Sequence, residues 1–423
     1  MAVRRSSQEE SFKMTEEKLK VMIAFPHSLE QSGGMEKACI VLANEMCSRG
    51  HKVRISCVYR DRQELYHPLK AGVELRSFMH EELRAFRSPY IGRCISRENK
   101  IIREFLRLFS KNWAGHWNER CQAAILQEGI CAELSEFEPD VIVSFRPDMS
   151  YFLMYAVGQE YPIITSFRFT PEHLMKKASR GDRKCLNEVD AIHVLQEDYI
   201  SLLKTDKIRA PIIYIPNTIP QYEQTAALSA DKSIYKIIYA ARINPEQKRQ
   251  HLLLEAFSRI ASDFPQWHLE FWGDDEHYAG SYTGEMKRFI QTHHLGKQVF
   301  ICGKTHNMEK IYQGADIFCI TSAFEGFSNA LGEAMSAGLP AIGYKSCPGV
   351  REIIDDGKTG FLAADGIASL SLALRTLMED KALRVQMGNN AHEAMKAYAT
   401  QVVGDKWEQL LYSVCREHKN RKQ

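Results

Sequence analysis

The segment KLKVMIAFPHSLEQSGGMEKACIVLANEMCSRGHKVRISCVY, residues 18–59, decides the fold class. It starts with a β-rich run at 18–25, passes through Gly33 and Gly34 into a helical pattern of apolar residues, and ends after Gly50 in a second β-rich run. Strand, glycine turn, helix and strand form a βαβ unit, whose two strands are parallel. We therefore predict an α/β fold with a parallel sheet.

The same alternation continues along the chain in two series. A proline-bounded segment, 213–220, is typical of a link between them. Because 423 residues exceed one ordinary core, we predict two domains, 18–215 and 222–395, followed by a helix at 396–418. The further predicted strands are 140–145, 162–167 and 191–195 in the first series, and 236–243, 267–273, 299–303, 316–322 and 340–344 in the second.

Composition favours an intracellular globular protein. Hydrophobic residues make up 44% of the chain and charged residues 26%, and a net charge of +2 gives no overall attraction to polyanions such as nucleic acid. The 11 scattered cysteines include no CxxC pair, which favours reduced thiols over disulfides or a zinc site. The N-terminus has no signal-peptide core, and no apolar run reaches about 18 residues. We expect a cytoplasmic protein, soluble or peripheral on a membrane.

The stretch FEGFSNALGEAMSAGLP, residues 324–340, predicts a ligand site. Ser328 or Asn329 can cap a helix that ends at Gly338, and the backbone N–H groups at such a helix start bind phosphate. Glu325 precedes this helix and Glu333 lies inside it, where carboxylates can accept hydrogen bonds from sugar hydroxyls. The interpretation is a nucleotide sugar, with its sugar at Glu325 and its ribose at Glu333; the alternative is a capped surface helix with two solvated glutamates. The residues expected to bind the diphosphate are Phe327, Ser328, Asn329, Ala330 and Leu331.

A second group of charges follows the predicted strand at 236–243. Arg242 ends this strand, and Lys248 opens the next helix after a proline turn. Two cations at the carboxyl end of a strand suit the ligand crevice of an open α/β sheet, where they stabilise a negatively charged leaving group. The alternative is a pair of exposed, solvated cations.

The block GFSNALGEAMSAGLPAIGY resembles the signature of the retaining family 4 glycosyltransferases, whose E-x7-E motif matches Glu325 and Glu333. The resemblance implies the GT-B fold: an N-terminal acceptor domain and a C-terminal donor domain, both Rossmann-like and facing each other, with a final helix that crosses back to the first domain. Further blocks occur in the family's order, namely SGGMEKACIVLANEMCSRGHKV, PDVIVSF, IPNTI, AARINPEQKRQHLLLEAF, FWGDDE, ICGKTHNMEKIYQGADIFCITS and GVREIIDDGKTGFL.

The resemblance also implies roles for individual residues. Arg242 and Lys248 would hold the donor diphosphate, although Ala241 stands where the family often has glycine. In SFRFTPEH, residues 166–173, Arg168 matches the slot that contacts the donor sugar, and His173 is its rival. The remaining donor-binding residues that the resemblance implies are Gly33 and Gly34 in a loop over the phosphates, Gly273 and Asp274 at a strand end, and Gly303 and Lys304 near the base. For these glycine-containing turns, the alternative is a plain structural turn.

A basic amphipathic stretch lies at 97–113. Its pattern is typical of a helix at an anionic membrane surface or against a lipid-linked acceptor. The alternative is a domain helix with its apolar face in the core and its cations in water; nucleic acid is a weaker third interpretation. The residues that carry this prediction are Arg97, Lys100, Arg103, Phe105, Arg107, Phe109, Lys111 and Trp113.

Together these features predict a retaining glycosyltransferase that transfers a hexose or N-acetylhexosamine from a nucleotide sugar, with UDP as the expected nucleotide. The resemblance extends to bacterial enzymes of surface-polysaccharide and lipid-linked oligosaccharide assembly, which implies a glycan acceptor on a lipid at the inner face of the cell membrane. We expect no metal and no other cofactor. The rival hypotheses are another GT-B enzyme, such as a sugar-nucleotide epimerase, and an inactive membrane-associated scaffold.

Overall fold

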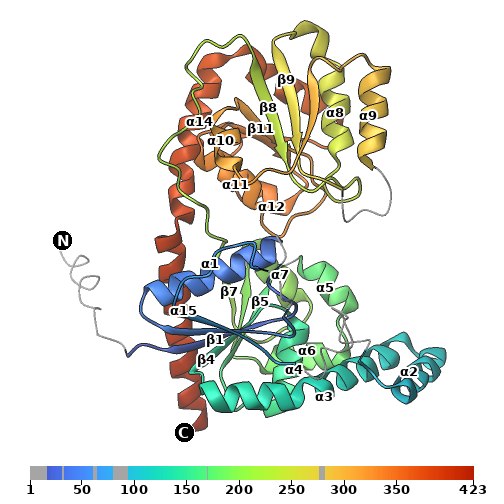
Figure 1. Ribbon diagram of the computed structural model, residues 1–423, viewed down its shortest axis with the longest axis vertical. Helices are drawn as coiled ribbons and strands as arrows, with labels where there is room; N and C mark the ends of the chain where they lie inside the picture. Colours follow the sequence, from blue (N-terminus) through green and yellow to red (C-terminus); the bar gives the residue numbers. More distant parts are fainter. Residues whose placement is uncertain (1–16, 31–32, 61–63, 80–93, 169, 276–281) are drawn as a thin grey trace, which may run out of the picture.

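The computed structural model describes residues 17–30, 33–60, 64–79, 94–168, 170–275 and 282–423. Two parallel sheets form the centres of two domains (Figure 1). The first sheet has the order β3-β2-β1-β4-β5-β6-β7 and the second the order β10-β9-β8-β11-β12-β13. The strands are β1 Lys20–Phe25, β2 Lys52–Cys57, β3 Val73–Ser77, β4 Val141–Ser144, β5 Ile163–Phe167, β6 Ala191–Val194, β7 Ile212–Tyr214, β8 Tyr235–Ala240, β9 Trp267–Trp272, β10 Val299–Gly303, β11 Ile317–Ile320, β12 Ala341–Tyr344 and β13 Gly360–Ala363.

Helices cover both faces of each sheet, as parallel strands require (Figure 1). In the N-terminal domain they are α1 Gly34–Ser48, α2 Arg97–Phe109, α3 Lys111–Phe137, α4 Pro147–Val157, α5 Pro171–Lys177, α6 Arg180–Glu188 and α7 Asp198–Thr205. In the rest of the chain they are α8 Gln250–Ser258, α9 Tyr282–Thr292, α10 Met308–Gln313, α11 Asn329–Ser336, α12 Pro348–Arg351, α13 Ile367–Glu379, α14 Lys381–Met395 and α15 Thr400–Lys422, with single 3-10 turns at 261–263 and 396–398.

Strand β1 shows how the N-terminal core is built. Successive side chains of a strand point to opposite faces, and both faces of this one are buried. Met22 and Ala24 pack in one hydrophobic cluster with residues of α3 and α4, whereas Val21, Ile23 and Phe25 pack in the other with α1 and α15. The run of apolar residues in β1 therefore reflects burial on both sides of a central strand.

The strand order reverses at one place in each sheet. Strands β1 and β4 are neighbours in the first sheet, and β8 and β11 are neighbours in the second, although each pair is separated in sequence by two other strands. At such a point the connections leave the carboxyl ends toward opposite faces, which opens a crevice between them. Each domain thus has one crevice at its carboxyl edge.

The last helix of the chain packs against the N-terminal domain. Helix α15 follows α14 out of the C-terminal domain and runs along the N-terminal domain beside α1 (Figure 1). Trp407 and Leu411 are buried in the cluster that also contains Val21 and Ile23. Arg49, directly after α1, forms ion pairs with Asp405 and Glu408 of this helix, at 2.7 and 3.0 Å.

Some local predictions differ from the structure. The predicted strand at 236–243 ends at Ala240, so Arg242 lies in the loop after β8 rather than at the strand's end. The single helix predicted at 97–113 is wrong: α2 ends at Phe109 and α3 begins at Lys111. Ser110 causes the break, because its hydroxyl accepts a hydrogen bond from the Trp113 N–H and caps the second helix.

In the part of the chain that the structure describes, every helix is too short or too polar to traverse a lipid bilayer.

The docking of α15 yields a stability prediction. Trp407 is buried, and its ring lies 4.5 Å from that of His193. We expect Trp407→Ala to lower the free energy of unfolding by about 3–5 kcal/mol, the usual cost of removing a buried aromatic side chain. Urea unfolding followed by circular dichroism measures the loss. Trp113→Ala is the matched control, because that side chain is 62% exposed; equal losses in both variants would contradict the docking.

Candidate functional site

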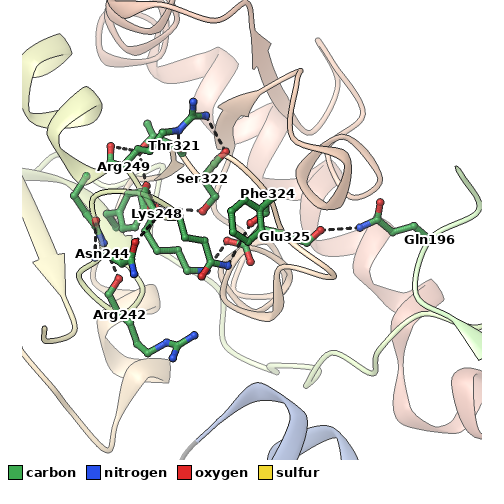
Figure 2. Close-up of polar contacts among 12 residues, drawn as sticks. Gln196, Arg242, Asn244, Lys248, Arg249, Thr321, Ser322, Phe324 and Glu325 are labelled. Atoms are coloured by element: carbon green, nitrogen blue, oxygen red, sulfur yellow. Dashed lines mark hydrogen bonds and ion pairs between the residues drawn. The ribbon is translucent and has the colours of Figure 1, made fainter. Parts of the chain in front are cut away.

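The connection between β8 and α8 is held rigidly at the carboxyl edge of the second sheet (Figure 2). The Asn244 side-chain oxygen accepts hydrogen bonds from the N–H groups of Glu246 and Gln247, which fixes a tight turn. The Lys248 carbonyl then accepts hydrogen bonds from the Tyr239 hydroxyl at 2.6 Å and from the Thr321 hydroxyl at 3.1 Å. Lys248 is therefore positioned by Tyr239 of β8 and by Thr321, the residue directly after β11.

Lys248 and Glu325 form the central ion pair of this crevice. The Lys248 Nζ lies 2.5 Å from Glu325 Oε1, and the side chains are only 14% and 8% exposed (Figure 2). Lys248 precedes α8 by two residues, so it does not open that helix as the sequence predicts. Arg242 is exposed beside them and forms no ion pair with a residue that the structure describes. One cation of the predicted pair is therefore neutralised by a carboxylate, and the other faces solvent.

The N-terminus of α11 borders the same crevice. The structure places Ser328 at the cap position, but its side chain makes no capping hydrogen bond, contrary to the sequence prediction. Phe327 and Leu331 belong to the hydrophobic core of the C-terminal domain, so these two residues can offer only backbone groups to a ligand. The first N–H groups of any α-helix have no partner within the helix, which leaves those at Asn329 and Ala330 available as donors.

Glu333 is paired across the domain boundary. Its Oε1 lies 2.5 Å from the Nζ of Lys37 in α1, and its Oε2 accepts a hydrogen bond from the Tyr312 hydroxyl at 3.2 Å. Burial and the Glu333 carboxylate raise the pKa of Tyr312, which keeps the hydroxyl protonated as a donor. Sequence analysis did not single out Lys37, although it lies in the quoted SGGMEK block.

The glycine loop before α1 faces the start of α11. A side chain at Gly34 would come within 3.6 Å of the Asn329 amide, and one at Gly33 would collide with the Glu36 carboxylate. Burial raises the pKa of Glu36, and the positive charge of Arg242 opposes that rise. The start of α1 in one domain therefore lies opposite Arg242 and the start of α11 in the other.

The other predicted strand ends lie together beside this crevice. Gly273 donates a backbone hydrogen bond to the Gly303 carbonyl at 2.8 Å. A side chain at Gly273, whose φ is +135°, would lie 1.9 Å from the Ala241 carbonyl oxygen, so only glycine fits there. Asp274 forms an ion pair with Lys304. The turns after β8, β9 and β10 are thus packed against one another.

Arg168 lies deeper than the other predicted residues. It is 9% exposed, its guanidinium donates a hydrogen bond to the Asn217 side-chain oxygen at 2.9 Å, and it stacks over the Phe145 ring at 4.3 Å. Burial lowers the pKa of Arg168 to about 10. The Asn217 amide in turn donates to the Asn329 side-chain oxygen at 3.1 Å. Arg168 is therefore connected to the start of α11 through Asn217. The side chain of its rival, His173, is not among the side chains that the structure describes.

Gln196 is a contact that sequence analysis missed. Its amide donates hydrogen bonds to the Glu325 carbonyl at 2.9 Å and to the Gly326 carbonyl at 2.5 Å (Figure 2). The available signal was a polar residue two positions after the end of β6. Together with Tyr199, whose hydroxyl donates to the Glu325 carbonyl, it fixes the carboxylate-bearing loop from the opposite domain.

No group of three or more histidine, cysteine, aspartate or glutamate side chains arranged for a metal ion occurs within the described ranges.

Comparison with solved structures identifies the fold. Sucrose-phosphate synthase from Thermosynechococcus elongatus superimposes with a TM-score of 0.70 at 16% identity, over 94% of this chain and 99% of that one. The Anabaena protein HepE, solved in complex with UDP-glucose, superimposes with a TM-score of 0.68 at 17% identity, over 93% of this chain and all of that one. The predicted GT-B fold is confirmed.

Curated proteins of bacterial glycan assembly are similar in sequence. An exopolysaccharide phosphotransferase of Streptomyces coelicolor is 26% identical over 400 residues, 90% of this chain. An N-acetylgalactosaminyltransferase of Campylobacter jejuni, named for an undecaprenol-linked substrate, is 23% identical over 403 residues, 93% of this chain and 98% of its own length. The chain spans 39% of the length of the Streptomyces protein and 32% of a poly(glycerol-phosphate) alpha-glucosyltransferase of Bacillus subtilis.

Residues 221–394, which include both walls of the crevice between β8 and β11, match the model of the family described as Glycosyl transferases group 1. The C-terminal domain of this chain is therefore a group 1 glycosyltransferase domain, as the resemblance of its sequence blocks predicts.

Proposed function

We propose that the protein is a retaining glycosyltransferase that moves a hexose or N-acetylhexosamine from a UDP-sugar to a glycan acceptor. One observation carries the proposal: Lys248 and Glu325 pair at the strand-order reversal of a group 1 glycosyltransferase domain, with Arg242 on the same connection as Lys248 and Glu333 on the helix that follows Glu325. UDP is supported by the structural likeness to Anabaena HepE, which binds UDP-glucose.

The bound donor would replace some of the ion pairs that the site residues form with one another. Its diphosphate meets the N–H groups of α11 and the cations Arg242 and Lys248, so that Lys248 is shared with or released from Glu325. Glu325 then accepts hydrogen bonds from the sugar hydroxyls. Glu333 accepts them from the ribose once Lys37 has moved away.

In the proposed reaction an acceptor hydroxyl oxygen bonds to the anomeric carbon on the face from which the diphosphate departs. The bond between that carbon and the phosphate oxygen breaks, and the hydroxyl proton passes to the departing phosphate. Arg242 and Lys248 stabilise the charge on the leaving group, which is the work expected of preorganised cations. We propose no resident metal, no other cofactor and no dedicated protein base.

The two rival hypotheses make different predictions. A sugar-nucleotide epimerase would turn over the UDP-sugar without an acceptor, and an inactive scaffold would lack charged residues at the donor site. All four charged residues of the donor site are present, which favours the active transferase.

Removal of the donor-site cations tests the proposal directly. We expect Lys248→Ala and Arg242→Ala each to lower transfer about a hundredfold, because one preorganised donor contributes about 3 kcal/mol to the transition state. Release of UDP from a panel of UDP-sugars, with a lipid-linked glycan as acceptor and with EDTA throughout, measures the rate. The matched control is Lys297→Ala, an exposed lysine of the same domain. Near-normal rates in both variants, with unchanged melting temperatures, would refute the donor site.

Calorimetric titration with UDP separates the two carboxylates. Glu333→Gln should weaken UDP binding, because it is assigned to the ribose, whereas Glu325→Gln should retain UDP binding and lose transfer, because it is assigned to the sugar. Lys37→Gln should strengthen UDP binding, since it frees Glu333 from its 2.5 Å ion pair. Loss of UDP binding in Glu325→Gln with full binding in Glu333→Gln would reverse the two roles.

We propose that the protein contacts the inner face of the cell membrane, and the exposure of helix α2 supports the membrane contact itself. No residue of α2 is buried, so the alternative with its apolar face in the core is wrong. The helix projects from the side of the N-terminal domain (Figure 1), and Phe105 and Leu108 are 59% and 81% exposed. The cations Arg97, Lys100 and Arg107 lie on the same helix, which suits an anionic lipid surface.

Co-sedimentation with vesicles tests this contact. We expect the wild-type protein to bind phosphatidylglycerol vesicles at low salt, less at high salt, and not phosphatidylcholine vesicles, because each surface cation contributes about 1 kcal/mol that salt screens. The double variant Phe105→Ser, Leu108→Ser should lose binding, whereas Leu372→Ser should retain it, because that leucine is 65% exposed in the other domain. A different result would show that α2 is a self-association surface: the wild-type protein would bind no vesicles but form a dimer, and the substitutions in α2 would dissociate it.

A further inference from the structure

A second polar pocket lies in the N-terminal domain, outside the donor site. Its volume is about 300 Å³, within the range of small-ligand pockets. The first part of α3, the connection from β4 into α4, α5 and the start of α6 supply its walls. The polar side chains that line it are Asn118, Glu119, Gln122, Arg146, Asp148 and Asp182.

Two carboxyl groups in this pocket, those of Glu119 and Asp182, hydrogen-bond to each other. Asp182 is 6% exposed, and its Oδ2 accepts the Ser179 N–H at 3.0 Å, whereas its buried Oδ1 has no N–H or hydroxyl donor among the described residues. Glu119 Oε2 is likewise buried without such a donor, and His116 Nδ1 lies 4.0 Å from it. Burial raises the pKa of both carboxyls, and the charge of Asp182 raises that of Glu119 further. A pair that shares a proton offers a hydrogen-bond donor and acceptors to a ligand.

The pocket opens at the strand-order reversal of its own domain. Arg146 follows β4, donates a hydrogen bond to Asp148 at 2.7 Å, and lies 3.2 Å from His27, which follows β1. Strands β1 and β4 are the neighbours between which the crevice of the first sheet forms. The loop of Gly33 and Gly34, which faces the donor-site helix α11, leaves the same carboxyl edge. The pocket is thus on the side of the domain from which an acceptor can meet the donor.

A cationic hollow adjoins this pocket. Arg103, Arg107 and Lys111 line it, and it shares Gly115 and Asn118 with the polar pocket. Arg103 donates a hydrogen bond to the Asn118 side-chain oxygen at 3.2 Å. Glu104 pairs with both arginines, but Lys111 forms no ion pair with any described residue.

The cationic hollow also adjoins the apolar face of α2. Arg107 lines both the hollow and a shallow surface formed with Ile101, Phe105 and Leu108. An exposed apolar face, a cationic hollow and a pocket rich in hydrogen-bonding groups therefore follow one another from α2 along α3.

We propose that these adjoining surfaces form the acceptor site, and that the acceptor is a sugar joined through a diphosphate to a lipid. The lipid lies on the α2 face, the diphosphate lies against Arg103, Arg107 and Lys111, and the first sugar lies in the pocket against Glu119 and Asp182. The inference deepens the proposed function and rests on it.

The order of the three surfaces matches the order of groups in such a molecule. Phosphate oxygens accept charge-assisted hydrogen bonds from guanidinium and ammonium groups. Sugar hydroxyls both donate and accept, which suits a carboxyl pair beside the amides of Asn118 and Gln122. The cationic hollow alone would also suit a simple lipid phosphate, and the polar pocket alone would also suit a free glycan. The fact that the two adjoin each other favours a molecule that carries both groups.

Calorimetry with two kinds of soluble probe tests the inference. The first probe is farnesyl diphosphate, and the second is its conjugate with N-acetylglucosamine, N-acetylgalactosamine or glucose. We expect the full-length protein to bind at least one conjugate about tenfold more tightly than farnesyl diphosphate, since hydrogen bonds to charged groups contribute at this level. Glu119→Gln and, separately, Asp182→Asn should abolish this preference while leaving farnesyl diphosphate binding unchanged. Lys111→Gln should weaken all probes about tenfold.

Matched controls come from the same helix. Glu128→Gln and Arg120→Gln change exposed residues of α3 away from the pocket and should bind every probe normally. Melting temperatures identify any variant that fails to fold. The Asp182→Asn variant retains a side-chain oxygen that can accept the Ser179 N–H and so preserve the start of α6. Agreement between this variant and Glu119→Gln would therefore assign the lost preference to the pocket.

Titration of each variant with UDP separates this inference from the proposed function. If the wild-type protein does not bind UDP, the donor assignment is refuted. Normal UDP binding, with no preference for any conjugate or with the preference intact in Glu119→Gln and Asp182→Asn, would overturn the acceptor site alone. Equal weakening of both probe types by the pocket variants would overturn the placement of the sugar.

Discussion

The reversal of strand order between β8 and β11 is the constraint on which the proposed donor site depends. Parallel strands place their carboxyl ends at one edge, and right-handed crossovers send the connections after β8 and β11 to opposite faces of the sheet. The space left between these connections receives Lys248 from one side and Glu325 from the other. The same reversal between β1 and β4 gives the facing domain its own crevice, so the two domains present corresponding openings to each other.

Charge neutrality governs how these openings are filled. Charges removed from water require partners, and in the structure the donor-site residues supply them to one another: Lys248 to Glu325 within a domain, and Lys37 to Glu333 between domains. A nucleotide sugar brings both phosphate charges and hydroxyl donors, which can replace these partners. The proposed donor binding would therefore be coupled to the contact between α1 and α11, and through Asn217 to the buried Arg168.

The candidate site was predictable where one connection carries two residues. Glu325 and Glu333 flank a single helix start, and Arg242 and Lys248 flank a single turn, so the chain itself brings each pair together. Lys37, Gln196 and Asn217 were missed, because each contacts α11 or the loop before it from a segment more than 100 residues away. The side chains of Phe327 and Leu331 also escaped local reasoning, since a helix start does not reveal which side faces the core.

The sequence by itself determined the α/β class, the two series of strands, the helix start at 328–329 and the charged residues of each strand end. These follow from local periodicity, glycine turns and the short reach of a single connection. Only the tertiary structure decided that Lys248 pairs with Glu325, that Arg168 is buried, and that the apolar face of α2 stays exposed while the same kind of face in α15 is covered. Both helices are amphipathic in sequence, and burial depends on whether another part of the chain packs against the apolar face, which periodicity does not encode.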